Sequence, residues 1–174
     1  MRFVIRTTYD RKALTVMART LRKTLRRKSG RRSTVFGAVV VILAGVLLFA
    51  KLRSGEGFDG GDWVTLAMAL LIIVTFFVQD ALNGALAGRK MLPGTEQGET
   101  VFTEDGFVTT TAAAETHWNH TQIKAAYETR DYFVFFLSSR HGQVYDKHGF
   151  TEGTPEEFRT FISEKTGKPV EYIK

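Results

Sequence analysis

The sequence has no cysteine among its 174 residues. This absence excludes a disulfide-bonded scaffold, a zinc or iron–sulfur site built on thiolates, and a cysteine nucleophile. The rest of the composition is ordinary, since hydrophobic residues make up 44% of the chain and the mean hydropathy is −0.09. These averages argue against a disordered chain, a collagen-like repeat or a low-complexity protein.

Acidic residues are almost missing from the N-terminal end of the chain. Residues 1–32 carry 12 Lys and Arg and a single acid, Asp10. Residues 33–90 carry four basic and four acidic residues, and residues 91–174 carry 8 basic and 13 acidic residues. The net charge of +6 is therefore the sum of a basic N-terminal part, a neutral middle and an acidic C-terminal part.

Two segments of the middle lack charge altogether. Thr34–Ala50 and Trp63–Val78 are 17 and 16 residues long and largely apolar. As helices they would measure about 24–26 Å, and a few flanking residues would extend each to the ~30 Å of a hydrocarbon core. The core helices of soluble proteins are rarely uncharged on every face over such a length. The sequence therefore predicts two transmembrane helices, with a pair of buried helices in a soluble protein as the alternative.

The distribution of Lys and Arg predicts the orientation of these spans. Twelve basic residues precede the first span, Arg89 and Lys90 follow the second, and only Lys51 and Arg53 lie in the connection. By the positive-inside rule, both termini are cytoplasmic and the chain is a multi-pass protein of the cell membrane. A cleaved signal peptide is not expected, because the charged segment before the first span is too long.

The basic N-terminal part predicts a strand over Arg2–Thr8 and an amphipathic helix over Arg11–Lys28, with Asp10 as its N-cap. We expect basic side chains next to the first span to contact an anionic lipid bilayer. The candidate lipid-contact residues are Arg19, Arg22, Lys23, Arg26, Arg27, Lys28, Arg31 and Arg32. In the alternative, the apolar stripe of the helix packs on the C-terminal domain. No nucleic-acid-binding motif accompanies the basic residues, so we expect no nucleic-acid partner.

The acidic C-terminal part predicts short strands followed by a helix. Pro93 and Gly94 mark a linker, after which strands are expected over residues 100–103, 107–111, 116–118, 122–129, 132–138 and 143–146. Tyr132–Leu137 is apolar on both faces, which predicts a central strand covered on both sides. Thr154 and Pro155 begin a helix that ends at Gly167.

These elements predict an α+β membrane protein in three parts. They are a basic strand and helix over residues 1–33, a transmembrane helical hairpin over 34–88, and a cytosolic domain over 91–174. In the domain, a small antiparallel sheet or barrel is capped by the C-terminal helix, and the N-terminal strand Phe3–Arg6 completes the sheet.

The order of these features resembles the YcxB-like bacterial membrane proteins. Two spans are followed by a structural motif of aromatic and apolar residues, namely Trp118, Ile123, Tyr132, Phe133 and Phe158. The resemblance implies that the C-terminal domain has a pleckstrin-homology-like (PH-like) fold. It implies no catalytic residues, and the biochemical activity of the family is uncharacterised.

Several glycines and one acidic residue lie in or near the spans, and we expect structural roles for them. We expect Gly37, Gly45, Gly84 and Gly88 to pack the two spans against each other, with homo-oligomerisation as the alternative. Asp80 lies near the cytoplasmic end of the second span, where we expect a hydrated interfacial carboxylate.

Patterns that point to catalysis are weak. Gly55–Gly60 matches the G-x-G-x-x-G spacing of dinucleotide sites, but it lies between two spans rather than between a strand and a helix. Ser138 and Ser139 lie near His141 and Asp146 without a nucleophile-turn motif. The four histidines, His117, His120, His141 and His148, show no ligand spacing that would bring them together. We therefore expect no enzyme activity, no cofactor and no metal.

The sequence thus predicts a membrane-anchored, non-enzymatic binding module with a cytosolic PH-like domain and an unidentified ligand. The expected partners are the anionic bilayer and a protein or peptide, and the strand Tyr132–Leu137 is a candidate surface wherever it is uncovered. The alternative function is a structural or assembly subunit of a larger membrane complex. The sequence leaves the oligomeric state open.

Overall fold

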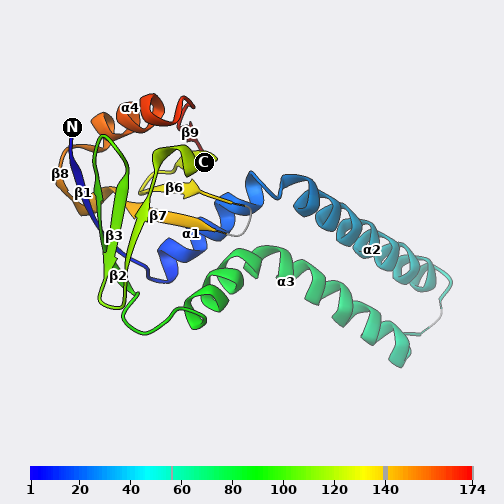
Figure 1. The fold of residues 1–174 in the computed structure, drawn as a ribbon. Helices are drawn as coiled ribbons and strands as arrows, with labels where there is room; N and C mark the ends of the chain where they lie inside the picture. Colours follow the sequence, from blue (N-terminus) through cyan, green and yellow to red (C-terminus); the bar gives the residue numbers. More distant parts are fainter. Residues whose placement is uncertain (56, 139–140, 174) are drawn as a thin grey trace. The chain divides into compact units, whose positions relative to one another are not determined.

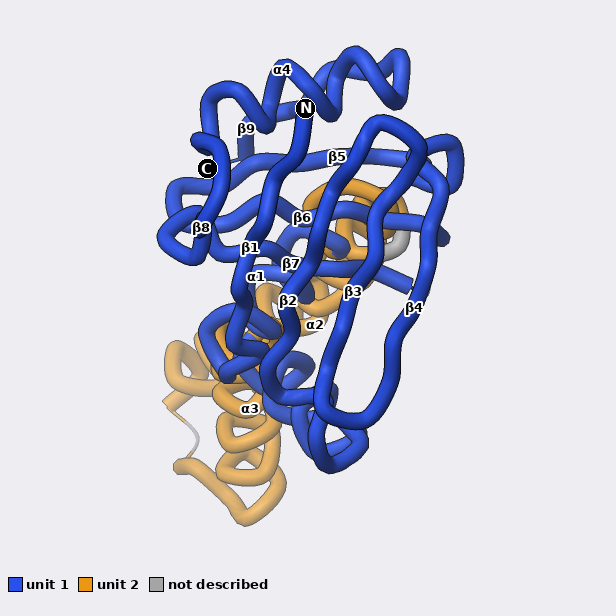
Figure 2. The backbone as a smooth tube through the Cα atoms, turned by 60° about the vertical axis from the view of Figure 1, so that its left-hand side comes forward, with its two compact units in different colours: residues 1–21, 81–174 blue, residues 22–80 orange. Residues whose placement is uncertain are grey.

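The computed structural model describes residues 1–55, 57–138 and 141–173 (Figure 1). The chain divides into two compact units (Figure 2). The β unit combines Met1–Leu21 with Ala81–Lys174, and the hairpin unit is Arg22–Asp80. The predicted parts, residues 1–33, 34–88 and 91–174, divide the chain at other positions, because the N-terminal strand and most of the helix after it belong to the same unit as the C-terminal sheets.

The hairpin unit contains helix α2 (Arg27–Arg53) and most of helix α3 (Gly60–Arg89). Each is long and apolar enough to cross a membrane, over Gly30–Arg53 and over Gly60–Arg89. The two helices approach closely at Gly37, where an added Cβ atom would lie 2.3 Å from Cζ of Phe76. The two predicted apolar helices are confirmed, and both extend beyond their uncharged cores.

The predicted basic helix over Arg11–Lys28 is wrong at its C-terminal end. Helix α1 covers Arg11–Lys23, and Lys28 already belongs to α2. Residues 24–26 form a turn in which the backbone N–H of Arg27 donates to the carbonyl of Thr24 over 3.0 Å. Among the described residues, the apolar side chains of α1 pack against the second sheet as far as Leu21, whereas Leu25 is exposed. Burial therefore does not favour a longer helix.

The first sheet of the β unit has the order β4-β3-β2-β1-β8. Its internal strand β1 pairs antiparallel with β2 on one side and with the edge strand β8 on the other. The prediction that the N-terminal strand completes the sheet is therefore confirmed. The strands are β1 (Phe3–Thr8), β2 (Gln97–Phe102), β3 (Phe107–Thr111), β4 (Glu115–Trp118) and β8 (Phe150–Glu152).

The second sheet has the order β7-β6-β5-β9. Every residue of β6 is buried, which confirms the predicted central strand. Leu137 is also buried, so Tyr132–Leu137 does not meet the condition under which it was a candidate surface, namely that the strand be uncovered. The elements are β5 (Ala125–Glu128), β6 (Tyr132–Phe136), β7 (Gly142–Asp146) and β9 (Glu171–Tyr172), with 3-10 turns η1 (His120–Gln122) and η2 (Lys147–Gly149).

One face of the second sheet packs with the first sheet and helix α4 (Pro155–Thr166) into the main core. Thr154 and Glu157 form the predicted capping box at the start of α4. Phe158 then inserts fully buried among aromatic rings, with its centroid 4.7 Å from that of Phe102 and 5.2 Å from that of Phe133. Burial of these rings is the main driving force for closing the unit.

The other face of the second sheet is covered by α1. Ala13 is fully buried, and Val16, Met17 and Leu21 pack around a cluster formed by residues of β5, β6 and β7. Of the two roles left open for this helix, packing of its apolar stripe on the C-terminal domain is confirmed. The basic side chains of α1 therefore lie on its remaining faces.

Helix α1 also packs on the last turns of α3 within the β unit. An added Cβ atom at Gly84 would lie 2.8 Å from the backbone nitrogen of Thr15, and one at Gly88 would lie 3.3 Å from Leu14. The prediction that these two glycines pack span against span is wrong, because they face α1. Gly45 has no neighbouring atom within 4 Å of the position of its Cβ.

Candidate functional site

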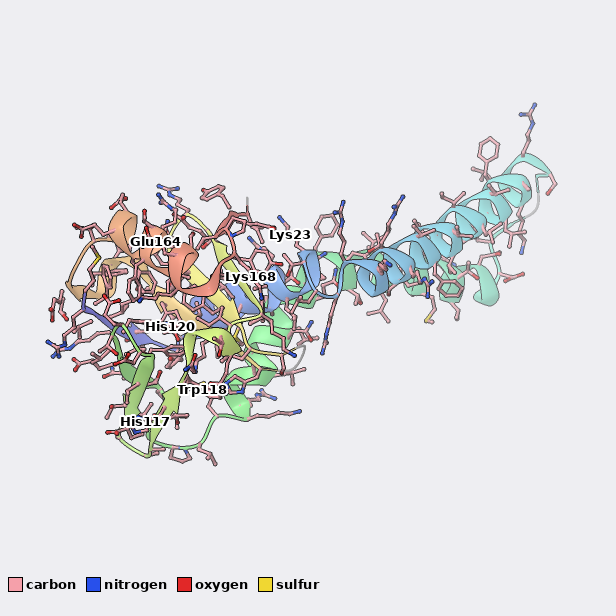
Figure 3. The ribbon with its side chains drawn as sticks, turned by 45° about the horizontal axis from the view of Figure 1, so that its top comes forward. Lys23, His117, Trp118, His120, Glu164 and Lys168 are labelled. Atoms are coloured by element: carbon pink, nitrogen blue, oxygen red, sulfur yellow. The ribbon has the colours of Figure 1, made fainter. Side chains whose placement is uncertain are left out.

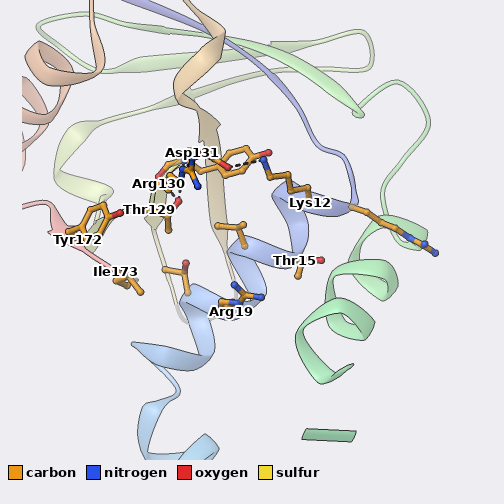
Figure 4. Close-up of a pocket in the computed structure, with 12 residues that line it drawn as sticks. Lys12, Thr15, Arg19, Thr129, Arg130, Asp131, Tyr172 and Ile173 are labelled. Carbon is orange, nitrogen blue, oxygen red and sulfur yellow. Dashed lines mark hydrogen bonds and ion pairs between the residues drawn. The ribbon is translucent and has the colours of Figure 1, made fainter. Parts of the chain in front are cut away.

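A cleft of about 490 Å³ opens in the β unit between α1, the turn joining β5 to β6, and the C-terminal segment (Figure 4). This volume is in the range of pockets that hold small molecules. The lining residues, called here the basic cleft, are Arg11, Lys12, Thr15, Val16, Arg19, Thr20, Thr129, Arg130, Asp131, Tyr132, Tyr172 and Ile173.

Helix α1 supplies one wall of the basic cleft. Its start is fixed by Asp10, whose carboxylate accepts a hydrogen bond from the backbone N–H of Ala13 over 2.7 Å. Because Ala13 faces the sheet, Arg11, Thr15 and Arg19 follow one another at four-residue spacing along a neighbouring face. Two guanidinium groups therefore stand on the same wall.

The tight turn after β5 supplies one cation, Arg130, to the opposite wall. The backbone N–H of Thr129 donates to the carbonyl of Tyr132 over 2.8 Å, and the Thr129 hydroxyl accepts from the backbone N–H of Tyr132 over 3.1 Å. These bonds close a two-residue turn with Arg130 and Asp131 at its tip. The side chain of Arg130 is 94% exposed, so its guanidinium is accessible from solvent.

One ion pair joins the two walls. Lys12 Nζ donates to Asp131 Oδ2 over 2.8 Å, and the same ammonium lies 5.5 Å from the centroid of the Tyr132 ring (Figure 4). The hydrogen bond from Lys12 lowers the pKa of Asp131 and raises the pKa of Lys12, so both are charged at neutral pH. The pair neutralises the carboxylate that lines the cleft, and Arg130 Nε also lies 3.9 Å from Asp131 Oδ1. Arg11 and Arg19 add two further basic residues to the lining.

The remaining surface of the cleft is apolar and aromatic. Val16 and Tyr132 contribute from α1 and β6, and Tyr172 and Ile173 contribute from the C-terminal segment. That segment is held by parallel pairing of β9 with β5 and by the backbone N–H of Ile173, which donates to the carbonyl of Glu128 over 2.8 Å. Burial raises the pKa of Tyr132, so its hydroxyl is neutral at physiological pH.

The eight candidate lipid-contact residues do not form one site. Arg19 lines the basic cleft of the β unit, whereas the other seven lie in the hairpin unit. There, Lys28, Arg31 and Arg32 border a hollow of about 510 Å³ that continues over Val35, Phe36 and Val39. Lys23 is the last residue of α1 (Figure 3), Arg26 lies in the turn, and Arg27 begins α2.

Arg22 has a specific protein partner. Its Nε and Nη2 atoms donate to the two carboxylate oxygens of Asp80 over 2.8 and 2.7 Å. Asp80 is 7% exposed, so the prediction of a hydrated interfacial carboxylate is wrong. A bidentate guanidinium–carboxylate pair of this kind stabilises the buried carboxylate, which would be costly to bury without a partner.

The five motif residues support the fold and do not line a common cavity. Ile123, Phe133 and Phe158 lie in the main core, and Trp118 packs against it. Tyr132 alone lies on the α1 side, where it joins the second cluster and the basic cleft.

The four histidines belong to different segments of the β unit, and Figure 3 labels His117 and His120. His117 Nε2 lies 2.9 Å from Glu115, and His120 is buried with its Nε2 2.8 Å from the carbonyl of Thr103. His141 has its ring 5.2 Å from that of Trp118. Among the described residues, no three His, Cys, Asp or Glu side chains come together as a metal site requires.

The structure describes the other patterns considered for catalysis only in part. Ser138 accepts a hydrogen bond from the backbone N–H of His141 over 3.0 Å, and this bond does not involve the imidazole. Ser139 lies outside the described residues. The glycines of 55–60 follow helix α2, so they are not preceded by the strand that a dinucleotide site needs. Glu56, within that pattern, also lies outside the described residues.

The sequence reasoning missed most of the basic cleft. It predicted the tight turn at Arg130 and Asp131, and it selected Arg19 for a different role. Nothing local connects that turn with Lys12, which precedes it by more than a hundred residues. The C-terminal wall at Tyr172 was also missed, because a two-residue strand has no periodicity to detect.

A comparison with known protein families finds a match for part of the β unit. The family model described as YcxB-like protein matches residues 102–162. This segment is YcxB-like. The YcxB-like segment runs from the end of β2 into α4, and it contains all five motif residues and the turn at Arg130. The predicted resemblance is therefore confirmed over this stretch, which leaves α1 and β9 outside it. No curated protein and no solved structure shows significant similarity to the chain.

Proposed function

We propose that this chain is a two-span membrane protein that holds a non-enzymatic binding module at the cytoplasmic face of the cell membrane. One observation carries the proposal: only 6% and 0% of the most apolar stretches of α2 and α3 are buried inside the protein. A water-soluble protein would bury apolar helices of this length, whereas a bilayer covers them with lipid. The excess of Lys and Arg before α2 supports cytoplasmic termini.

The β unit is the binding module of this proposal. Two sheets, antiparallel except for the pair β5–β9, are closed by a C-terminal helix, which is consistent with the PH-like fold that the YcxB-like resemblance implies. The basic cleft supports a binding role, because basic residues of two elements line it beside aromatic and aliphatic side chains.

Contact with anionic lipid is part of the proposal. On α2, Lys28, Arg31 and Arg32 lie next to Val35, Phe36 and Val39 around one hollow. This change from basic to apolar side chains along one helix face suits headgroups at one end and acyl chains at the other.

Membrane extraction tests the anchor. We expect the native chain to stay in the membrane pellet after alkaline carbonate treatment, and the double variant Leu70→Arg, Leu71→Arg to be released. Both leucines are exposed, at 60% and 59%, so these charges would be harmless in a soluble protein. In a span, each arginine costs about 2.5–3.5 kcal/mol of insertion free energy.

Leu92→Arg is the matched control, because Leu92 is 70% exposed and lies beyond both spans. This control should remain in the pellet. Release of the native chain by carbonate, or identical extraction of the control and the double variant, would contradict the proposed anchor.

An assembly subunit of a larger membrane complex is the second candidate. The exposed apolar side chains of α2 and α3, and the open surface at Gly45, would suit contacts with the helices of other proteins. Extraction in a mild detergent distinguishes the two candidates, since a stoichiometric partner that co-purifies through the spans would favour the assembly subunit.

A further inference from the structure

We propose that two copies of this chain pair through the free edge of strand β4, in an antiparallel arrangement centred on Thr116. The partner that occupies this edge is therefore a second copy of the same chain. The inference goes beyond the proposed function, because it identifies an interaction surface of the β unit that involves neither the spans nor the lining of the basic cleft.

Strand β4 is the outer strand of the first sheet (Figure 2). It pairs with β3 on one side, and among the described residues no strand pairs with it on the other side. Glu115, Thr116 and His117 are all exposed. An exposed strand edge presents backbone N–H and C=O groups to which a further strand can bind.

The other strands at the sheet edges are less suited to such pairing. The ladder between β8 and β1 is irregular between Val4 and Ile5. Strand β7 lies beside β1, where the backbone N–H of Asp146 donates to the hydroxyl of Thr7 over 3.2 Å. Strand β9 has two residues. Strand β4 instead pairs with β3 in unbroken register over its four residues, and it contains no Pro or Lys that would oppose an added strand.

The hydrogen bonds of the β3–β4 hairpin indicate which backbone groups face the free edge. The backbone N–H of Thr111 donates to the carbonyl of Ala114 over 2.8 Å, so these two residues form a hydrogen-bonded pair. Hydrogen-bonded and non-hydrogen-bonded pairs alternate along an antiparallel ladder. The backbone groups of Thr116 therefore face β3, whereas those of Glu115 and His117 point to the free edge.

This orientation defines one self-complementary register. With Thr116 opposite Thr116 of the other copy, Glu115 of each chain lies opposite His117 of the other. The outward N–H and C=O groups of both residues then form hydrogen-bonded pairs. The same register places Trp118 opposite Ala114, a large side chain beside a small one. A two-fold axis through the Thr116 pair repeats the other contacts, as an isologous interface requires.

The charges of the side chains favour the same register. Because Trp118 packs against the main core, Glu115 and His117 point to the opposite face of the sheet. There, 55% of the Glu115 side chain and 71% of the His117 side chain are exposed. A register centred on His117 would place two imidazoles opposite each other, and one centred on Glu115 would place two carboxylates opposite each other. The register centred on Thr116 places a carboxylate opposite an imidazole on both sides of the axis, which is the favourable cross-strand combination.

Cysteine cross-linking tests this pairing, because the chain has no native cysteine. Residues opposite each other in a non-hydrogen-bonded pair have Cα atoms about 4.5 Å apart, a separation that suits a disulfide bond. We expect Thr116→Cys to form a disulfide-linked dimer when membranes that contain the full chain are oxidised. Thr110→Cys is the matched control, because Thr110 is also exposed but lies on β3, away from the edge. The control should remain monomeric.

Charge reversal tests the register. In the Thr116→Cys chain, the further change His117→Glu places two carboxylates opposite each other, and we expect loss of most of the cross-linked dimer. Adding Glu115→Lys to that chain brings opposite charges together again and should restore the dimer. Both side chains are exposed, so the thermal midpoint should not change in these variants.

Equal cross-linking of Thr116→Cys and Thr110→Cys, or no cross-linked dimer of either, would overturn the inference. A cross-linked product that contains a different protein would also overturn it, because another partner would then occupy the edge. Failure of Glu115→Lys to restore the dimer would contradict the register centred on Thr116.

Discussion

At the scale of single residues, Glu128 is the most constrained charge of the β unit. It is 4% exposed and accepts hydrogen bonds from Arg159 at 2.5 and 2.8 Å and from the ammonium of Lys147. The three residues come from β5, η2 and α4, so the cluster ties the second sheet to the C-terminal helix. Arg159, followed by Lys147, lowers the pKa of Glu128 below its ordinary value of 4.5 despite burial.

This lowered pKa gives a pH dependence of known sign. A carboxylate with a lower pKa in the folded state stabilises the protein above its unfolded pKa and loses that contribution as the pH falls through the folded pKa. We expect the free energy of unfolding to decrease as the pH falls through 4.5 and below. Glu128→Gln should lower this free energy by about 2–3 kcal/mol at pH 7 and make its decline with falling pH shallower.

Urea denaturation of the full chain in detergent, repeated across this pH range, measures both effects. Glu152→Gln is the control, because Glu152 and its partner Arg2 are both exposed and such pairs contribute about 0–1 kcal/mol. An unchanged pH slope in Glu128→Gln would show that this cluster does not determine acid stability.

At the scale of elements, close helix packing depends on one glycine of α3. A side chain at Gly84 would meet the backbone nitrogen and Cα atom of Thr15 at 2.8 and 2.9 Å, and a helix backbone cannot move away as a flexible side chain can. We expect Gly84→Val to separate α1 from α3 and to lower stability by about 1–3 kcal/mol, measured as a lower thermal midpoint.

Gly45→Val is the matched control, because it makes the same change in a span where no atom lies within 4 Å. Its thermal midpoint should stay close to that of the native chain. Equal losses in the two variants would indicate a general cost of valine in these helices and would contradict the proposed contact.

The elements also show what the sequence could and could not predict. The apolar helices, the buried strand β6 and the capping box at Thr154 follow from local patterns, and all were predicted. The end of α1 at Lys23 and the partner of Gly84 depend on what lies across the fold, and both were predicted wrongly. The basic cleft depends on contacts of the same long-range kind.

At the scale of the whole molecule, the β unit is assembled from both ends of the chain. Strand β1 lies between β2 and β8, with Phe3 opposite Phe102 and Val4 opposite Glu152. The segment that inserts between these ends in the sequence is the hairpin unit. Folding of the binding module therefore requires that the N-terminal strand remains available to the C-terminal segment.

This arrangement predicts the behaviour of fragments. We expect residues 91–174 alone to lack a cooperative thermal transition, because they lack strand β1, which joins β2 to β8 in the first sheet, and the helix that covers the second sheet. A chain in which residues 1–21 are joined to 81–174 by a flexible linker should regain the transition. Cooperative melting of the 91–174 fragment by itself would contradict this requirement.

Membrane topology is the central claim, and the absence of cysteine allows it to be tested cleanly. Gly57→Cys places one thiol in the exposed connection between α2 and α3, and Glu164→Cys places one on the exposed surface of α4. We expect a membrane-impermeant maleimide to label Gly57→Cys in intact cells. The same reagent should label Glu164→Cys only after the cells are lysed. Labelling of Glu164→Cys in intact cells, or protection of both thiols until lysis, would contradict the account.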